Sequence, residues 1–168
     1  ELLKALELKD RWHPPLARHC QLKGIEFMST PFDHKAVDVL VPYVKRIKIG
    51  SGDLTDLPLL KYIAQVGKPV ILSTGMSTLT EIRSSLSALS QYKIPITLLH
   101  CTSLYPAPFA SVNLRAMITL KKKFGLPVGY SDHTIGTTIA IASAALGASV
   151  IEKHFTLGKD RPGPDHRV

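Results

Sequence analysis

The strict alternation of short strand-like runs with helical runs is the feature that most limits what this chain can fold into. Runs rich in β-branched residues, each followed by a polar or glycine-containing turn, predict strands at Ile25–Thr30, Arg46–Gly50, Val70–Thr74, Ile96–Cys101, Pro127–Ser131 and Val150–His154. Apolar residues at helical spacing predict helices between them, at Lys35–Val44, Asp56–Val66, Leu79–Gln91, Asn113–Phe124 and Ile135–Leu146. A chain of this kind forms a parallel sheet, either doubly wound or closed as a (β/α)8 barrel.

Local signals at the ends of the predicted helices agree with this pattern. Thr78, followed three residues later by Glu81, is typical of a capping box at a helix start. Glycines that can adopt the left-handed conformation stand where helices are expected to end: Gly67, Gly125 and Gly147. The proline-rich stretches are interpreted as turns: Pro14-Pro15 and Pro162–Pro164.

The sequence favours a barrel over a doubly wound sheet. A dinucleotide-binding sheet would carry Gly-x-Gly-x-x-Gly after its first strand, whereas Gly50-Ser51-Gly52 lacks the third glycine and the acidic residue beyond it. The sequence also has no Walker-type phosphate loop. Polar residues cluster at the carboxyl ends of nearly all the predicted strands, where barrel enzymes place their active sites. We therefore expect an α/β fold that is a partial TIM (β/α)8 barrel.

The composition is that of one folded domain. The 168 residues are 45% hydrophobic and 20% charged. Apolar stretches such as Ile135–Val150 are interrupted and fall short of the roughly 20 residues that a membrane-spanning helix needs. Cys20 and Cys101 are the only cysteines and lie far apart, so neither a disulfide framework nor a thiolate zinc site is implied. We expect a cytoplasmic protein with no membrane partner.

The formal net charge of +8 leaves several anionic partners open. The densest basic run, Lys121-Lys122-Lys123, closes a predicted helix, where cations interact favourably with the helix dipole and with solvent. No interleaving of aromatic and basic residues supports nucleic-acid binding. Small anionic substrates therefore explain the charge better than a nucleic acid does.

The last two predicted strands carry a candidate metal site. Period-two alternation places Glu152 and His154 on one face of their strand with Lys153 on the other, and Ser131 and His133 also share a face. In a barrel, two imidazoles and a carboxylate would then converge, a set suited to Mn²⁺, Zn²⁺, Fe²⁺ or Co²⁺. The alternative is that His133 caps the following helix, or that His154 is a hydrogen-bonded core residue.

A candidate phosphate site lies at another strand end. Lys48 ends its strand just before Gly50-Ser51-Gly52, where small residues let backbone N–H groups approach an anion closely. Hydroxyl pairs at three further strand ends could donate to phosphate or carboxylate oxygens: Ser29-Thr30, Ser73-Thr74 and Thr102-Ser103. Taken singly, each pair could equally be a helix cap or a turn.

Seven blocks of sequence in order are similar to the motifs of the N-acetylneuraminate (sialic acid) synthase family, whose members are phosphoenolpyruvate-condensing TIM-barrel enzymes. The resemblance covers nearly the whole chain and is strongest from Gly24 to His166. The blocks are Phe27–Asp33, Lys48–Asp53, Leu72–Met76, His100–Pro106, Gly129–Thr134, Glu152–Leu157 and Gly163–His166.

The resemblance implies a metal site and an anion site. His133 and His154 would ligate a divalent metal, Mn²⁺ or Mg²⁺, together with the substrate aldehyde oxygen and water. The residues that would hold phosphoenolpyruvate are Thr30, Lys48, Ser51, Ser73 and Ser131. Ser103 stands where some members carry an asparagine that contacts phosphoenolpyruvate.

The resemblance also implies a sugar site and a reaction. Glu152 and Asp165 match acidic positions near the sugar and, with Lys48, would be catalytic, while Tyr105 would line the sugar pocket. In the implied reaction, the metal polarises the aldehyde of an N-acetylated amino sugar of the N-acetylmannosamine type. C3 of phosphoenolpyruvate attacks that aldehyde, water adds at C2, and phosphate leaves, which gives a 2-keto-3-deoxy acid.

The resemblance further implies the organisation of the whole protein. Residues 1–168 would be an incomplete synthase barrel, roughly strands three to eight, without the small antifreeze-like C-terminal domain of the family. The full-length protein would be a homodimer. Two alternatives stay open: a synthase for legionaminate, pseudaminate or a spore-coat polysaccharide sugar, and an inactive fragment that acts as a basic binding module.

Overall fold

A single parallel sheet forms the centre of the molecule. In the computed structural model, which describes residues 7–168, the strands are hydrogen-bonded in chain order: β1 (Ile47–Ile49), β2 (Val70–Ser73), β3 (Ile96–Cys101), β4 (Val128–Asp132) and β5 (Ile151–Lys153). Each strand pairs in parallel with the next. This confirms the α/β class and the expectation of a partial barrel, because an open doubly wound sheet would reverse its strand order at one point.

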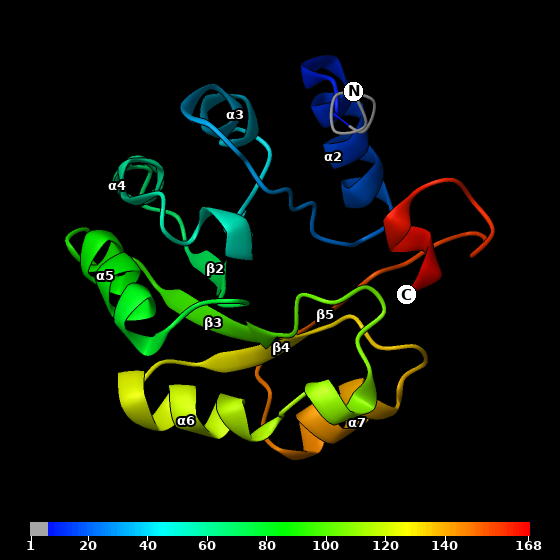
Figure 1. Cartoon of the computed structure of the whole chain (residues 1–168). Coiled ribbons are helices and arrows are strands. Elements are labelled where there is room, and N and C mark those ends of the chain that lie inside the picture. The colour runs from blue at the N-terminus through cyan, green and yellow to red at the C-terminus, as the bar shows by residue number, and fades with distance from the viewer. Residues whose placement is uncertain (1–6) are drawn as a thin grey trace.

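The helices follow one another around the outside of the curved sheet (Figure 1). They are α3 (His34–Leu40), α4 (Leu57–Gln65), α5 (Leu79–Ser90), α6 (Arg115–Phe124) and α7 (Thr138–Ala145). All five lie where helical spacing predicted them, with ends that differ by a few residues. Short 3-10 turns complete the chain: η1 (Asp10–Trp12), η2 (Ser51–Asp53), η3 (Phe109–Ser111) and η4 (Pro164–Arg167).

One helix was not predicted. Helix α2 (His13–Leu22) begins with proline at its first positions, so the interpretation of Pro14-Pro15 as a turn is wrong. Proline is compatible with the first turn of a helix, because the N–H that it lacks would have no partner there.

The first predicted strand, Ile25–Thr30, is also wrong. The segment is irregular, and within residues 7–168 no ladder hydrogen bond joins it to β1. Its backbone is anchored instead by a 3.0 Å bond from the Ile25 N–H to the Cys20 carbonyl. Glu26 accepts from Arg46 at 2.8 and 3.1 Å, which ties the segment to the sheet only through side chains. A β-branched run becomes a strand only where a neighbouring strand offers hydrogen bonds.

Both faces of the sheet are buried near its centre. The strand cores are apolar, as is usual for parallel sheets covered on both sides. Helix α4 packs Leu60 and Ile63 against this core. Gly129 of β4 lets the chain before β5 approach closely, since a Cβ there would collide with the Val150 carbonyl and lie 2.8 Å from the Leu99 side chain. The core thus fixes the strand ends that carry the polar residues.

The structure contains the capping signals that the sequence predicted at the start of α5 and the end of α6. Thr78 and Glu81 form a reciprocal capping box at the start of α5. Gly125 is the left-handed C-cap of α6, with φ of 68°, and its N–H donates to the Lys121 carbonyl at 2.9 Å. The basic run Lys121-Lys122-Lys123 occupies the last turn of α6, where the helix dipole favours cations.

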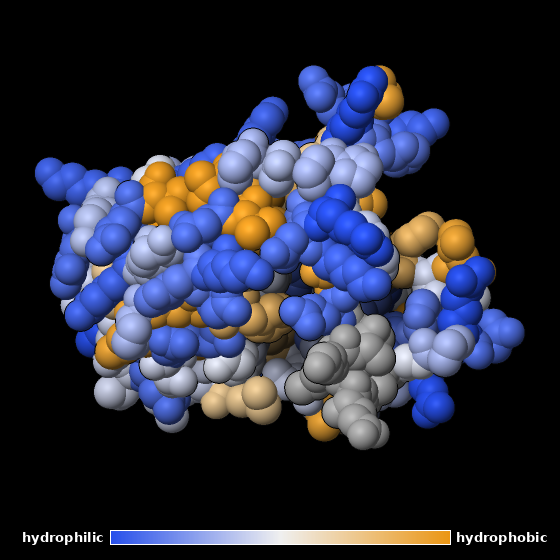
Figure 2. All heavy atoms as spheres, turned by 90° about the horizontal axis from the view of Figure 1, so that it is seen from above, coloured by the Kyte–Doolittle hydropathy of each residue, from blue (hydrophilic) through white to orange (hydrophobic). Residues whose placement is uncertain are grey.

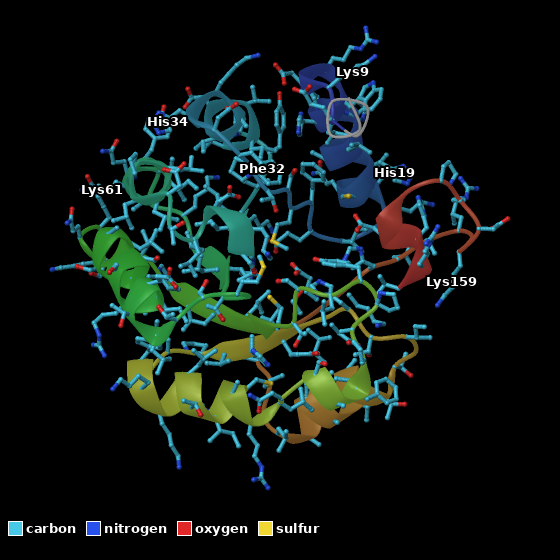
Figure 3. All side chains as sticks on the ribbon, viewed as in Figure 1. Lys9, His19, Phe32, His34, Lys61 and Lys159 are labelled. Carbon is cyan, nitrogen blue, oxygen red and sulfur yellow. The ribbon has the colours of Figure 1, made fainter. Side chains whose placement is uncertain are left out.

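The visible surface is mostly hydrophilic. Seen from above, hydrophobic side chains form separate patches among polar ones (Figure 2). Lys9, Lys61 and Lys159 lie at the periphery, while Phe32 lies on the inner side of α3 (Figure 3). Among residues 7–168, no helix combines the length and the apolar character that crossing a membrane requires.

Candidate active site

Polar side chains from four strands share the concave face of the sheet. In a parallel ladder, residues paired in register point to the same face. Ser73 pairs with Leu99, Cys101 pairs with Ser131, and Ser131 pairs with Glu152. Lys48 joins them from β1, because its ammonium donates to the Ser73 hydroxyl at 2.8 Å. The carboxyl ends of the strands therefore bring these groups together.

These groups form one continuous polar chain across the sheet. Lys48 Nζ lies 3.5 Å from a Glu152 carboxylate oxygen, and the Ser131 hydroxyl donates to the other Glu152 oxygen at 2.7 Å. Lys48, Ser73 and Ser131 are all buried, so their charges and dipoles act with little screening from solvent. Because Ser73 and Glu152 both anchor Lys48, its ammonium is fixed before any ligand arrives.

Two imidazoles stand at the far end of this chain. The rings of His133 and His154 have centroids 5.4 Å apart. His133 Nδ1 donates to the Thr102 carbonyl at 2.8 Å, so the neutral ring carries its proton there and its lone pair on Nε2. Burial lowers the pKa of His133, which favours this neutral form.

Among the described residues, the Nε2 lone pair of His133 has no donor that is free to satisfy it. The Ser131 hydroxyl lies 3.4 Å away, but its single proton is given to Glu152 at 2.7 Å. A histidine that ligates a metal is usually neutral: one ring nitrogen donates to a carbonyl or carboxylate, and the other keeps a free lone pair for the metal. For His133 these nitrogens would be Nδ1 and Nε2.

Tyr105 covers the imidazole pair. Its ring centroid lies 4.1 Å from that of His133 and 5.5 Å from that of His154. The side chain is about half exposed, and its partial burial raises the pKa of the phenol. The Tyr105 ring thus forms one wall beside the two imidazoles.

A compact group at the ends of β1, β2 and β3 surrounds Gly75. The Gly75 N–H donates to Ser51 Oγ at 3.0 Å, and Ser51 Oγ lies 3.2 Å from Cys101 Sγ. A Cβ on Gly75 would lie 2.5 Å from Ser103 Oγ and 2.8 Å from Cys101 Sγ. Only glycine fits without displacing this group. The group places the two serines beside the end of β2.

Sequence reasoning assigned no role to Gly75, Cys101 or the Thr102 carbonyl. Cys101 could have been found, because alternation along β3 places it on the same face as Leu99. Gly75 follows a predicted strand directly, which is a signal for close approach. A backbone carbonyl such as that of Thr102 leaves no trace in the sequence.

Two of the predicted site residues, Thr30 and Asp165, lie away from the polar chain of the concave face. Thr30 lies with Ser29 beside a separate hollow that His13 and Asp10 also line. Asp165 is exposed on η4, although its charge contributes to the raised pKa of Tyr105. Among the described residues, no hydrogen bond joins either one to the polar chain, so their roles stay predictions.

Two hydroxyls that could have bound an anion are already engaged. Thr74 donates to the Leu99 carbonyl at 3.0 Å, and Thr102 donates to the Ser111 carbonyl at 3.1 Å. The alternative that His133 caps a helix is also wrong, because α7 begins at Thr138 with Thr137 as its N-cap. His133 is therefore free of a capping role and belongs to the concave face of the sheet.

The residues present fit a metal with two protein ligands. Within residues 7–168, no three His, Cys, Asp or Glu side chains are grouped so as to enclose an ion. The imidazoles of His133 and His154 are nevertheless neighbours, and Nδ1 of His133 is already engaged with the Thr102 carbonyl. Such a pair suits a catalytic ion whose other positions are filled by substrate and water.

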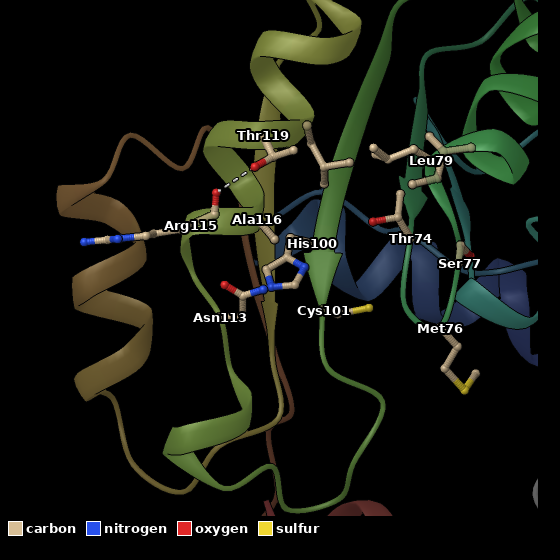
Figure 4. A pocket seen from close by; sticks show the side chains of 12 residues that line it. Thr74, Met76, Ser77, Leu79, His100, Cys101, Asn113, Arg115, Ala116 and Thr119 are labelled. Atoms are coloured by element: carbon tan, nitrogen blue, oxygen red, sulfur yellow. Dashed lines mark hydrogen bonds between the residues drawn. The ribbon is translucent and has the colours of Figure 1, made fainter.

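A hollow of about 410 Å³ lies on the other side of β3, between the β2–α5 connection and α6. His100 lies there between β3 and α6 with Asn113 beside it, and Met76 points away (Figure 4). The His100 ring donates to the Val112 carbonyl at 2.8 Å, and burial lowers the pKa of His100. This hollow is separate from the polar chain of the concave face.

Comparison with known proteins identifies the family. A family model described as the NeuB family matches residues 1–168, and the chain belongs to this family. A relative in Campylobacter jejuni named N,N'-diacetyllegionaminic acid synthase is 52% identical over 100% of this chain and 52% of its own length. One of the same name in Legionella pneumophila is 48% identical over 99% of this chain and 48% of its own length. A pseudaminic acid synthase of Helicobacter pylori is 37% identical over 98% of this chain and 49% of its own length.

Solved structures agree with this assignment. A sialic acid synthetase from Leptospira borgpetersenii, solved with citrate, superposes with a TM-score of 0.93 at 38% identity, over 97% of this chain and 57% of that one. A phospho-2-dehydro-3-deoxyheptonate aldolase from Thermotoga maritima superposes with a TM-score of 0.81 at 18% identity, over 94% of this chain and 49% of that one, which shows a shared fold. This chain spans about half the length of the curated relatives it matches.

Proposed function

We propose that this chain carries active-site residues of a nonulosonic acid synthase, which condenses phosphoenolpyruvate with an N-acetylated amino sugar and releases phosphate. The observation that carries the proposal is the polar chain from Lys48 through Glu152 to Ser131, whose hydroxyl lies 3.4 Å from Nε2 of His133, the first of the two paired imidazoles. The names of the relatives support it, since they include an N,N'-diacetyllegionaminic acid synthase, a pseudaminic acid synthase and an N-acetylneuraminate-9-phosphate synthase.

The anion end of the site would hold phosphoenolpyruvate. Lys48 is a buried cation bound to the Ser73 hydroxyl, and Ser51 stands at the adjacent strand end. A phosphate there would receive charge-assisted hydrogen bonds from groups that are already in place. Such preorganised groups also stabilise charge that develops on the leaving phosphate.

The imidazole end would orient the sugar. A divalent cation such as Mn²⁺ or Mg²⁺, held by His133 and His154, would supply a Lewis acid for the sugar aldehyde oxygen. Tyr105 would form the wall of the sugar pocket, because its ring lies against both imidazoles. This would place the aldehyde carbon within reach of C3 of phosphoenolpyruvate.

Glu152 is the side chain best placed to act as the general base. Its carboxylate lies between Lys48 and Ser131, so it joins the anion end to the imidazole end. When C3 attacks the aldehyde, a cation forms at C2 and the aldehyde oxygen takes up a proton to become a hydroxyl, while Glu152 can accept a proton from the water that adds at C2. The C2–O bond to phosphate then breaks, phosphate leaves with the bridging oxygen, and the new C2 hydroxyl gives its proton to the departing phosphate to form the ketone. Asp165 on η4 is the second candidate for this step.

The sugar is best assigned by the identities of the relatives. Relatives named N,N'-diacetyllegionaminic acid synthase are 52% and 48% identical, whereas the pseudaminic and N-acetylneuraminate-9-phosphate synthases are 34–37% identical. We therefore favour an acceptor hexose with two acetamido groups. N-acetylmannosamine is the second candidate, and the 38% identity to the sialic acid synthetase supports it.

An assay of the complete natural protein tests this proposal. The protein is incubated with phosphoenolpyruvate, Mn²⁺ and each acceptor in turn, and released phosphate and product mass are followed. We expect equimolar phosphate and a nonulosonic acid, at a higher kcat/KM for the diacetamido hexose. A folded protein that releases no phosphate with any of these acceptors would contradict the proposal and favour a binding module.

A further inference from the structure

We propose that the largely buried Asp132–Lys153 ion pair is a positioning device that fixes the ends of β4 and β5, so that the imidazoles of His133 and His154 lie side by side. The inference rests on the proposed function, because it assigns a task to residues that support the two imidazoles. Neither residue reaches the concave face. Asp132 precedes His133 and Lys153 precedes His154, so both point to the helix side of the sheet.

Asp132 is fully buried and its hydrogen bonds organise the turn around His133. One carboxylate oxygen accepts from the Thr134 N–H at 2.9 Å and from the Thr134 hydroxyl at 2.8 Å. The other accepts from Lys153 Nζ at 3.0 Å. Asp132 therefore holds the residue after His133 and reaches across to β5 at once.

Lys153 closes the same network from the neighbouring strand. It lies directly opposite Asp132 in the parallel register of β4 and β5. Its ammonium also donates to the Thr134 carbonyl at 2.7 Å. Lys153 thus binds the residues on both sides of His133. These contacts fix the position of β5 along β4 more firmly than the backbone hydrogen bonds of a three-residue strand would do alone.

The two imidazoles differ in how much they depend on this pair. His133 has anchors of its own, since its ring bonds the Thr102 carbonyl and its own carbonyl accepts from the Ala107 N–H at 2.8 Å. For the His154 ring, the described part of the chain provides aromatic contacts and no hydrogen bond. The position of His154 is therefore set mainly by its neighbour Lys153.

The decisive variant removes both charges while keeping the side-chain sizes: Asp132→Asn with Lys153→Met. Removing one partner alone would leave a buried unpaired charge, which is strongly destabilising, whereas removing both is often tolerated. The matched control removes the exposed Asp10–Lys35 pair in the same way, Asp10→Asn with Lys35→Met. Both double variants are made in the complete natural protein, and thermal melts confirm that each one folds.

Mn²⁺ affinity, measured by electron paramagnetic resonance without substrate, is the main readout. We expect the buried double variant to bind Mn²⁺ about 10–100-fold more weakly, the range typical of lost outer-shell support. Its KM for phosphoenolpyruvate should stay near that of the parent while kcat falls, because Lys48 and Ser73 are untouched. The exposed double variant should match the parent in every measurement.

The possible results separate this inference from the proposed function. A folded buried double variant with parental Mn²⁺ affinity and kcat would overturn the positioning role. If the parent itself binds no Mn²⁺, the metal part of the proposed function fails. A crystal structure of the buried double variant then decides the present inference: displaced imidazoles support it, and an unchanged His133–His154 arrangement overturns it.

Discussion

At the scale of single residues, Lys48 is the group on which the anion site depends. Its ammonium is buried, bonded to Ser73 and paired with Glu152. Lys48→Met removes a charge-assisted hydrogen bond worth roughly 1.5–3 kcal/mol, so KM for phosphoenolpyruvate should rise about tenfold or more. Lys61→Met, an exposed change on α4, is the control and should leave both KM values unchanged. A raised sugar KM with an unchanged phosphoenolpyruvate KM would show that the roles are misassigned.

Gly75 gives a second test at this scale. A Cβ there would collide with Ser103 Oγ, Cys101 Sγ and Ser51 Oγ at 2.5 to 2.9 Å. Gly75→Ala should therefore cost about 1–3 kcal/mol of unfolding free energy through overpacking and weaken phosphoenolpyruvate binding as the two serines move. Gly52→Ala is the matched control, since its added methyl group meets nothing within 4 Å. Urea melts that show equal midpoints for the two variants would refute the crowding argument.

At the scale of elements, the capping box of α5 is the clearest local device. Thr78 accepts from the Glu81 N–H at 3.2 Å, and Glu81 accepts from the Thr78 N–H at 2.7 Å. Losing the threonine cap should lower the melting temperature of Thr78→Ala by about 2–4 °C. Ser84→Ala, on the exposed middle of the same helix, should leave the melting temperature unchanged or raise it. Equal melting temperatures for the two variants would mean that the cap contributes nothing.

The same box predicts a pH dependence. The hydrogen bonds from Thr78 hold the pKa of Glu81 below its usual range. A depressed folded-state pKa stabilises the protein above the unfolded-state pKa, and this contribution is lost as the pH falls through the folded-state pKa. Glu81→Gln keeps the box but cannot titrate, so wild type should lose more stability in acid than this variant does. Parallel stability curves from neutral pH to pH 3 would contradict this.

Sequence alone predicted most elements because several helices carry local signals, such as the capping box at the start of α5 and the left-handed Gly125 at the end of α6. It failed at Ile25–Thr30, where strand formation depends on a neighbouring strand, and at α2, where proline at the first turn resembles a break. Alternation along β4 and β5 correctly placed Ser131, His133 and Glu152 on one face. Gly75 and Cys101 each carried a sequence signal, but their contacts with Ser51 and Ser103 could not be foreseen, because these residues are distant in sequence.

At the scale of the whole molecule, the open edges of the sheet make a prediction. Among the described strands, β1 and β5 each have one neighbour, so each leaves a row of backbone groups unpaired. Residues 1–168 expressed alone should therefore self-associate and release no phosphate from phosphoenolpyruvate. The complete natural protein, in contrast, should be a homodimer that releases phosphate. Sedimentation velocity and a phosphate assay check this. A monodisperse, active monomer of residues 1–168 would contradict the partial-barrel account.

The most direct test of the central claim is to locate the substrate. A crystal structure of the complete natural protein with phosphoenolpyruvate and Mn²⁺ would show which face of the sheet binds them. We predict the phosphate within hydrogen-bond distance of Lys48 Nζ and Ser73 Oγ, and Mn²⁺ between the imidazoles of His133 and His154. Phosphoenolpyruvate bound instead in the hollow beside His100, or Mn²⁺ bound away from both imidazoles, would contradict the account.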